Sequence, residues 1–350
     1  MKNTTRYHID KKTKRKVQAE EKRLALMMRA LKAVHSATSP ESMTQKDLDH
    51  QRAGQELLGR LVTPMIGMRW EPFDLAGMKA AWVKPEWGHD PNKVILYCHG
   101  GGYTSGNLGY SRPLASKLSH ITGWETLSFE YRLAPEHPFP AAVEDAEKAW
   151  DYLMYQGYGA KDITVAGDSA GGNLALVLCH RLKAAGRMLP GHLVLMSPWT
   201  DMTASGESYE TRKELDPSIT EDYIHAVRSA YAGDADITDP QLSPLYGDFT
   251  GFPPTLVQVG SNEILYSDTA MLRQKMTAAG VVCRMEEWQD MWHVFQMFPI
   301  KKAAHAIDHS QIGFGYHHPA YLERLRQCSE YAPENYRHKH KRCSKKRQPG

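Results

Sequence analysis

The sequence predicts an α/β fold, a mostly parallel central sheet flanked by helices and covered by a helical cap. Short apolar segments alternate with longer amphipathic ones through most of the chain, a rhythm typical of parallel strands joined by helices. The composition, with 41% hydrophobic and 24% charged residues, is that of an ordinary globular protein. The 350 residues allow one large domain with elaborations.

Two helices are predicted before the sheet. From about Val17 to Ala37, apolar residues recur at spacings of three and four, which predicts one apolar helix face. These residues are Leu24, Met27, Met28, Leu31 and Val34. A second helix is predicted from about Thr44 to Leu61, and Pro64 ends it. Residues 1–60 are thus expected to form an N-terminal helical cap segment. Packing over a site and ordinary helix packing both explain the apolar face.

The sheet and its covering helices are predicted in residues 61–312. The predicted strands are Met78–Lys84, Lys93–Cys98, Glu125–Glu130, Ile163–Ala166, His192–Met196, Thr255–Val259 and Val281–Glu286. The predicted helices between them are Pro113–His120, Ala141–Gln156, Asn173–Ala185, Glu221–Ala232 and Ser267–Ala279. A terminal helix is predicted around His305 and His309. Residues 200–232 are a long insertion expected to belong to the cap, and residues 313–350 form a basic C-terminal extension.

The formal charge of +3 hides an uneven distribution. Residues 1–32 carry eleven Lys or Arg against three Asp or Glu, and residues 337–350 carry seven Lys or Arg and no acid. Basic ends can hold nucleic acid or an anionic membrane surface. However, few aromatic residues are interleaved with the basic ones, as a single-strand binder would need, and the body between the ends is acidic. We therefore predict solvated tails and no nucleic-acid partner.

The cysteines and the hydropathy indicate a cytoplasmic protein. The five cysteines are odd in number and lack paired metal-ligand spacing, which argues against a disulfide framework or a zinc site. No stretch approaches the roughly 18 apolar residues of a membrane helix, so no membrane insertion is expected. The basic, polar stretch up to Lys16 lacks the apolar segment of a signal peptide. The oligomeric state, including a homodimer, is left open.

The strongest chemical signal is Gly167-Asp168-Ser169-Ala170-Gly171, followed by Gly172. It lies between a short apolar strand and a helix. In that setting a G-x-S-x-G pentapeptide forms a tight turn that exposes the serine hydroxyl. The helix N-terminus behind the serine also favours negative charge during acyl transfer. The segment predicts Ser169 as a nucleophile.

A second signal is the segment His99-Gly100-Gly101-Gly102, directly after a predicted strand. Consecutive glycines allow backbone N–H groups to point into a site, where they can stabilise an oxyanion. A phosphate-binding loop is the alternative. No Lys-Ser or Lys-Thr follows, and no G-x-G-x-x-G frame is present, so the phosphate alternative lacks its usual features.

Taken together, these motifs resemble the hormone-sensitive-lipase-like branch of the α/β-hydrolases, which includes carboxylesterases, acetylesterases and monoterpene lactone hydrolases. The resemblance covers roughly residues 60–305 and includes the segments 131–142 and 291–295. It implies an α/β-hydrolase fold. It also implies oxyanion donors at the N–H groups of Gly101, Gly102 and Ala170, and a His99 that braces the glycine loop.

The general base and its acid are expected late in the chain, because this fold orders its triad as Ser, acid, His. His293 follows the last predicted strand at loop distance and is the preferred base; His305 and His309 are weaker candidates. The acid is predicted at Glu263, where many relatives carry an aspartate. Asp268, inside the following helix, is the alternative.

The predicted activity is hydrolysis of a small-molecule carboxylic ester with a short acyl chain, through an acyl-enzyme and without a metal or organic cofactor. Tyr103, Trp199 and Trp292 are candidate walls of the substrate pocket, although a place in the core would explain them equally well. A lactone or amide hydrolase with the same machinery is an alternative. A ligand-binding pseudoenzyme is another, but such receptors usually lack a catalytic group, and here all three have candidates.

Overall fold

The computed structural model describes residue 22 and residues 24–33, 44–61, 65–86 and 89–313. Of the two basic ends, residues 1–21, 23 and 337–350 lie outside the described residues, as do Val34, Cys328 and Cys343. Most of the predicted C-terminal extension also falls outside them.

The described strands form one sheet in the order β1-β2-β4-β3-β5-β6-β7-β8. Strand β2 is antiparallel to β1 and to β4, and every other neighbouring pair is parallel. The strands are β1 Met68–Leu75, β2 Met78–Pro85, β3 Val94–Cys98, β4 Glu125–Phe129, β5 Ile163–Asp168, β6 His192–Met196, β7 Thr255–Gly260 and β8 Cys283–Trp288. The mostly parallel sheet predicted from the sequence is confirmed.

Strand β1 was not predicted. It carries Pro72 and alternates exposed with partly buried residues, so its sequence resembles a loop. It pairs with β2 alone, at the edge of the sheet, and an edge strand tolerates a proline. Between the two strands, Ala76 and Gly77 adopt positive φ values of 51° and 85°, and Gly77 N–H donates to Asp74 Oδ1 at 2.8 Å.

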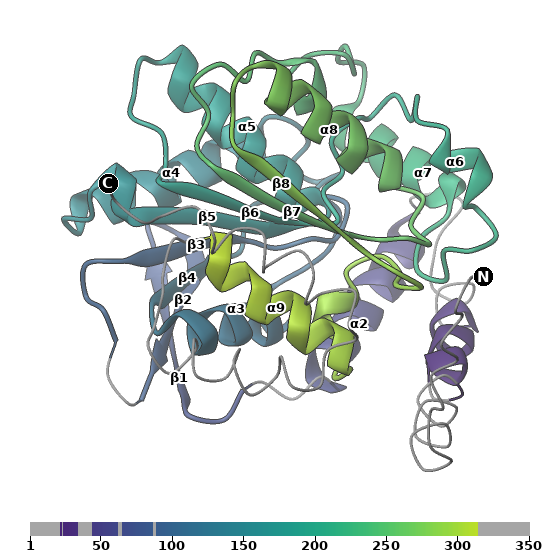
Figure 1. Cartoon of the computed structure of the whole chain (residues 1–350), viewed down its shortest axis with the longest axis horizontal. Coiled ribbons are helices and arrows are strands. Elements are labelled where there is room, and N and C mark those ends of the chain that lie inside the picture. The colour runs from purple at the N-terminus through teal and green to yellow at the C-terminus, as the bar shows by residue number, and fades with distance from the viewer. Residues whose placement is uncertain (1–21, 23, 34–43, 62–64, 87–88, 314–350) are drawn as a thin grey trace, which may run out of the picture.

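Helices cover both faces of the sheet (Figure 1). On one face lie α4 Ala141–Tyr155, α5 Ala170–Ala184 and α8 Tyr266–Ala278, and on the other α3 Leu108–Thr122 and α9 Lys301–Gly313. The buried strands supply both cores, because successive side chains point to opposite faces. In β3, Val94 and Leu96 join the first cluster, and Ile95 and Tyr97 join the second.

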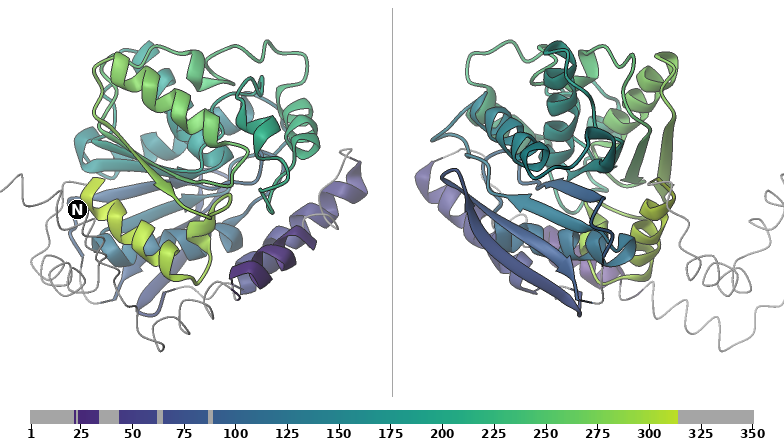
Figure 2. Two further views of the ribbon diagram at one scale, coloured as in Figure 1. Left: turned by 45° about the vertical axis from the view of Figure 1, so that its right-hand side comes forward. Right: turned by 90° about the vertical axis from the view of Figure 1, so that its left-hand side faces the viewer.

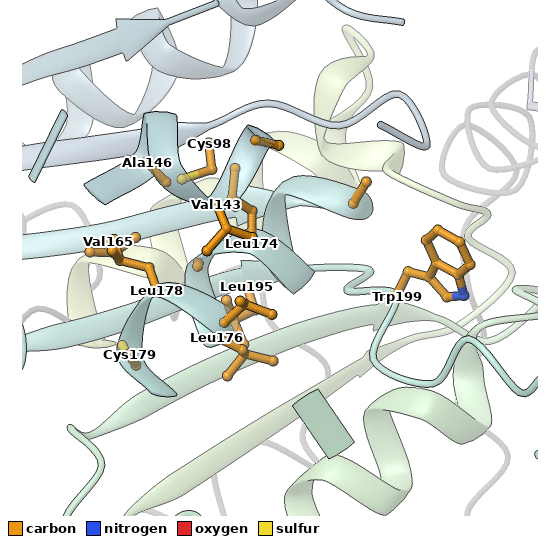
Figure 3. Packing of buried hydrophobic residues seen from close by; sticks show 14 of the residues in the cluster. Cys98, Val143, Ala146, Val165, Leu174, Leu176, Leu178, Cys179, Leu195 and Trp199 are labelled. Atoms are coloured by element: carbon orange, nitrogen blue, oxygen red, sulfur yellow. The ribbon is translucent and has the colours of Figure 1, made fainter. Parts of the chain in front are cut away.

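Helix α5 lies at the centre of the first cluster. Figure 3 shows Leu174, Leu176 and Leu178 of this helix in the same apolar cluster as Val165 of β5 and Leu195 of β6. All five side chains are fully buried. This packing fixes α5 on the sheet and thereby fixes the residue that precedes the helix, Ser169.

Helix α3 begins earlier than predicted. The helix was predicted to begin at Pro113. The helix starts at Leu108 instead, since the side chain of Asn107 accepts a hydrogen bond from Tyr110 N–H at 2.9 Å and caps it there. Pro113 lies inside the helix.

The remaining helices gather near the carboxyl ends of the strands. Helix α2 spans Gln45–Leu61, and residues 200–232 contain α6 Ser208–Thr211 and α7 Glu221–Ala232. Figures 1 and 2 show α6 and α7 beyond the strand ends and the N-terminal helices alongside. Residues 24–33 are helical, and the predicted apolar face packs on the second cluster through Leu24, Met27, Met28 and Leu31.

We expect Leu178→Ala to lower the free energy of unfolding by about 2–5 kcal/mol, because it removes buried methyl groups and leaves a cavity under α5. Chemical denaturation followed by circular dichroism measures this change. Leu57→Ala is the matched control, since Leu57 is also helical but 57% exposed, and it should cost much less. Equal losses for the two variants would contradict the packing described for α5.

Candidate active site

Ser169 stands at a sharp turn between strand β5 and helix α5. Its backbone has φ 53° and ψ −120°, a conformation that L-residues rarely adopt and that is common at functional sites. The turn brings backbones together so closely that side chains are excluded. A methyl group on Gly171 would lie 2.0 Å from the carbonyl oxygen of Cys98, and one on Gly167 would lie 2.2 Å from that of Gly171. The two glycines of the motif are therefore required by close approach.

The structure brings Ser169, His293 and Glu263 into one chain of hydrogen bonds. His293 Nε2 lies 2.9 Å from Ser169 Oγ, and His293 Nδ1 lies 3.2 Å from Glu263 Oε2. The Glu263 side chain is fully buried, and that of His293 is 9% exposed. Ser169 follows β5, Glu263 follows β7, and His293 follows β8. Carboxyl ends of parallel strands meet at one edge of a sheet, which explains why residues so distant in sequence converge.

The oxygen of Glu263 that faces away from His293, Oε1, has two donors of its own. Its Oε1 accepts hydrogen bonds from Gly260 N–H at 2.5 Å and from Ser197 Oγ–H at 2.8 Å, which leaves Oε2 for the imidazole. Ser197 Oγ also accepts from Val294 N–H at 3.1 Å. Ser197 thus connects the carboxylate to the residue that follows His293. Sequence reasoning missed Ser197, although a polar residue at the end of a buried strand was a usable signal.

Asp268, the alternative acid, has other partners. It lies in α8, as predicted, and its Oδ2 accepts from Thr200 N–H at 2.8 Å and from Asp201 N–H at 2.9 Å. Burial raises the pKa of Asp268 to about 7, and these backbone donors oppose the rise. The geometry therefore places Glu263 beside the imidazole and uses Asp268 to hold the segment after β6.

Opposing effects act on the pKa of His293. Burial lowers it, whereas the hydrogen bond to Glu263 and the charge of that carboxylate raise it. The charges of Asp216 and Asp168 raise it further, and the pKa ends above its ordinary value of 6.5. A raised pKa makes the neutral form of this imidazole a stronger base towards the Ser169 hydroxyl.

The glycine loop lies next to the serine turn. Gly101 and Gly102 have φ values of 119° and 61°, which favour glycine. Among the described residues, none accepts a hydrogen bond from the N–H groups of Gly101, Gly102 or Ala170. A methyl group on Gly102 would lie 2.9 Å from Val227 Cγ1, so α7 packs directly over the loop. Three backbone donors thus remain available near the site.

Asp168 connects the serine turn to the glycine loop. Its carboxylate accepts from Tyr97 Oη at 2.5 Å, from Tyr110 Oη at 2.9 Å and from Gly100 N–H at 3.0 Å. Burial raises the pKa of Asp168, although the two tyrosines and the Gly100 amide oppose the rise. No role beyond the turn was predicted for this residue, because its partners come from β3, the glycine loop and α3.

His99 contacts the backbone of the glycine loop. Its Nδ1 lies 2.8 Å from Gly100 O, and its ring stacks on Tyr131 with 4.2 Å between centroids. Tyr131 Oη–H in turn donates to His99 O at 2.8 Å. Burial lowers the pKa of His99 to about 4, so the ring is neutral at neutral pH. These contacts suit the bracing role that the family resemblance implied.

The three candidate pocket walls are buried in the interior. Tyr103 stacks on Tyr231 at 3.8 Å between centroids and donates to Asn173 Oδ1 at 2.7 Å. Trp199 lies in the same apolar cluster, whereas Trp292 lies in the cluster on the opposite face of the sheet. Contact of these residues with a substrate stays a prediction.

The weaker histidine candidates lie on α9. His305 is exposed, and His309 Nδ1 is 3.1 Å from Glu286 Oε1. Within the described residues, no group of three or more His, Cys, Asp or Glu side chains is placed to hold a metal ion. In the same part of the chain, no helix combines the length and apolar character needed to cross a membrane.

Comparison with known proteins identifies the family. The alpha/beta hydrolase fold family matches residues 95–297. An acetyl-hydrolase of Streptomyces hygroscopicus is 38% identical over 247 residues, 70% of this chain and 80% of that protein. The crystal structure of an esterase from the bacterial hormone-sensitive lipase family superposes with a TM-score of 0.78 at 35% identity, covering 83% of this chain and 96% of that one.

A third similarity comes from the esterase EstE5, in a crystal soaked with p-nitrophenyl butyrate. It superposes with a TM-score of 0.77 at 34% identity, covering 83% of this chain and 97% of that one. The chain therefore belongs to the α/β-hydrolase family, and within it to the hormone-sensitive-lipase-like esterases. The family, the fold class and the enzyme class predicted from the sequence are confirmed.

We expect Ser197→Ala to lower the free energy of unfolding by about 1–3 kcal/mol, because it leaves the buried Val294 N–H without a partner and removes one donor from Glu263. Chemical denaturation measures this change. Ser128→Ala is the matched control, since Ser128 Oγ is buried with no hydrogen-bond partner among the described residues. If both substitutions had the same effect, the bridge through Ser197 would contribute nothing.

Proposed function

We propose that this chain hydrolyses short-chain carboxylic esters through an acyl-enzyme on Ser169. The observation that carries the proposal is the chain of hydrogen bonds from Ser169 through His293 to Glu263. It links a nucleophile to a base and the base to a buried carboxylate, which is the arrangement used for acyl transfer on several unrelated folds. The similarity to esterases supports the same conclusion.

The first half of the reaction forms the acyl-enzyme. His293 Nε2 takes the proton of Ser169 Oγ as that oxygen bonds to the ester carbonyl carbon. Glu263 keeps the second proton of the imidazole on Nδ1 and stabilises the imidazolium that forms. When the tetrahedral intermediate collapses, the bond to the alkoxy oxygen breaks, and His293 returns its proton to the departing alcohol.

The second half repeats these steps with water. His293 removes a proton from a water molecule, and the oxygen of that water attacks the acyl carbon. The bond between the acyl carbon and Ser169 Oγ then breaks, and His293 returns its proton to Ser169. In both halves the negative charge on the former carbonyl oxygen needs donors. The N–H groups of Gly101, Gly102 and Ala170 are proposed to supply them, at a benefit of roughly 3 kcal/mol per donor in comparable sites.

The preference for short acyl chains rests on two supports. The similar proteins include an acetyl-hydrolase and an esterase soaked with p-nitrophenyl butyrate. In this structure α7 packs on the glycine loop, with Val227 and the Tyr223 hydroxyl next to Gly102. A cap helix in this position restricts the space beside the proposed oxyanion site. Lactones and amides remain substrates to test.

The proposal extends to organisation and location. Residues 61–312 would form the catalytic domain, with residues 1–60 and 200–232 as its cap and residues 313–350 as an extension. A small-molecule ester would be the partner. The cytoplasmic location predicted from the free thiols stays a prediction, and so does the possibility of a homodimer.

We expect Ser169→Ala to lower kcat/KM for p-nitrophenyl esters by roughly 10⁴-fold or more, because the nucleophile is lost. The assay runs from acetate to palmitate, and the wild-type rate should be highest on short chains. In acid-quenched wild-type samples taken during turnover of p-nitrophenyl butyrate, mass spectrometry should find the acyl group on Ser169. An acyl group on another residue, or undiminished turnover by Ser169→Ala, would overturn the proposal.

The pH dependence should report the protonation of His293. Its pKa is raised, and only the neutral imidazole can accept the serine proton, so kcat/KM should be lost as the pH falls through a value above 6.5. In Glu263→Gln the group that raises this pKa loses its charge. The acid limb should then move to lower pH, and the plateau should fall by roughly 10²–10⁴-fold. A Glu263→Gln profile superimposable on that of the wild type would exclude Glu263 as the acid.

A further inference from the structure

One buried carboxylate next to the Ser–His–Glu chain has no part in the mechanism above. Asp216 lies in the segment that follows α6, and only 4% of it is exposed. Its Oδ1 accepts from Ser218 N–H at 2.9 Å, and its Oδ2 accepts from Ile264 N–H at 3.1 Å. Ile264 directly follows Glu263. Asp216 therefore holds the backbone beside the carboxylate that contacts His293.

Further contacts fix the same cap segment on the loop that carries Glu263. Arg212 Nη1 donates to Ser261 O at 2.5 Å, and its guanidinium lies 3.5 Å from the centroid of the Tyr266 ring. Ser208 N–H donates to Ser267 Oγ at 3.0 Å, and Ser267 N–H donates to Ser208 Oγ at 2.9 Å. The hydrogen bond from Ile264 N–H to Asp216 is thus one of several contacts that join residues 208–216 to residues 261–267.

The charges around Asp216 belong to the proposed catalytic groups. His293 and Glu263 act on it, while His293 itself is faced by Glu263 after β7, by Asp216 from the cap and by Asp168 at the end of β5. Among the described residues, no Lys or Arg forms an ion pair with Asp216. Burial raises the pKa of Asp216 to about 7, Glu263 adds to the rise, and His293 opposes it. The imidazole is therefore the basic group coupled to this carboxylate.

We propose that Asp216 is a positioning residue that fixes the loop of Glu263 and thereby holds the Glu263 carboxylate at His293 Nδ1. The proposal rests on the proposed function, because that contact matters only if His293 accepts the Ser169 proton. During that transfer, Glu263 stabilises the imidazolium through its hydrogen bond, and Asp216 keeps the backbone next to Glu263 in place.

The test compares Asp216→Asn with Asp268→Asn. Both aspartates are buried, both accept two backbone N–H bonds, and burial raises the pKa of both to about 7. Only Asp216 binds the backbone next to Glu263, whereas Asp268 binds the segment after β6. The readout is the rate of covalent inactivation by a small phosphonofluoridate as a function of pH, alongside kcat and KM for p-nitrophenyl acetate. Inactivation depends on Ser169 and His293 whatever ester is the natural substrate.

In Asp216→Asn the acid limb of the inactivation profile should move to lower pH, because a Glu263 carboxylate that is held less firmly at His293 Nδ1 raises the pKa of His293 less. The plateau rate and kcat should fall by roughly tenfold, as expected when hydrogen bonds to a charged group are weakened, with KM little changed. Asp268→Asn should leave the position of the acid limb unchanged, whatever its effect on stability.

The outcomes separate the two proposals. If the wild type is not labelled at Ser169, the proposed function fails. If the wild type is labelled and the acid limb of Asp216→Asn coincides with that of the wild type, the role of Asp216 fails alone. An equal shift in both variants would also overturn it, because the effect would then follow from loosening of the structure. If Asp216→Asn does not fold, Arg212→Gln, which loosens the same segment on the loop of Glu263, should lower kcat and move the acid limb in the same direction, and an unchanged acid limb would overturn the proposal.

Discussion

The site depends on the close approach of the first turn of α5 to the end of β3. A methyl group on Gly171 would lie 2.0 Å from the carbonyl oxygen of Cys98, so the first turn of α5 is fixed against the end of β3. Asp168 spans the same junction and binds Gly100 N–H across it. Since Ser169 lies between these contacts, the position of its hydroxyl and that of the glycine loop are set together. The strained backbone of Ser169 persists because α5 is fixed by its buried leucines.

Three buried carboxylates hold different parts of the site. Glu263 bonds to His293 directly, Asp216 binds the backbone next to Glu263, and Asp168 binds the glycine loop from the serine turn. None of the three is exposed by more than a few per cent. A buried charge is costly unless it is paired or hydrogen-bonded, and each of these carboxylates accepts backbone N–H bonds. The backbone thus satisfies carboxyl groups that would otherwise be costly to bury beside the site.

Much of this architecture could be predicted from the sequence, because its signals are local. The buried strands are short apolar runs, and the motif around Ser169 is contiguous. Edge strand β1 could not be recognised, since its exposed face and Pro72 remove the pattern that a buried strand would show. The early start of α3 depends on one side-chain cap at Asn107, five positions before the predicted start of that helix.

Within the site, the residues that could be predicted are those with a characteristic neighbourhood in the chain. Ser169 and His293 have such neighbourhoods, and the position of Glu263 follows from its loop after β7. Ser197 and Asp216 have none, because their partners lie 66 and 48 positions away in sequence. Ser197 bonds to the Glu263 side chain, and Asp216 bonds to the N–H group of Ile264. A polar residue at the end of a buried strand draws attention to Ser197, but the partners of both residues become visible only once the strand ends are assembled.

The N-terminal segment belongs to the site for the same reason. Arg52 of α2 donates to Thr104 O at 2.9 Å, just beyond the glycine loop, and pairs with Glu136 at 2.7 Å. Its neighbour Gln51 donates to the hydroxyl of Tyr223 on α7 at 2.8 Å. Helix α2 therefore joins the glycine loop to the cap helix above it. Because the segment after α6 is fixed in turn to the loop of Glu263, the cap contacts both the proposed oxyanion donors and the acid. A displacement of the cap would then disturb the proposed oxyanion donors and Glu263 together. The space above Ser169 therefore depends on the same contacts as the geometry of the proposed catalytic groups.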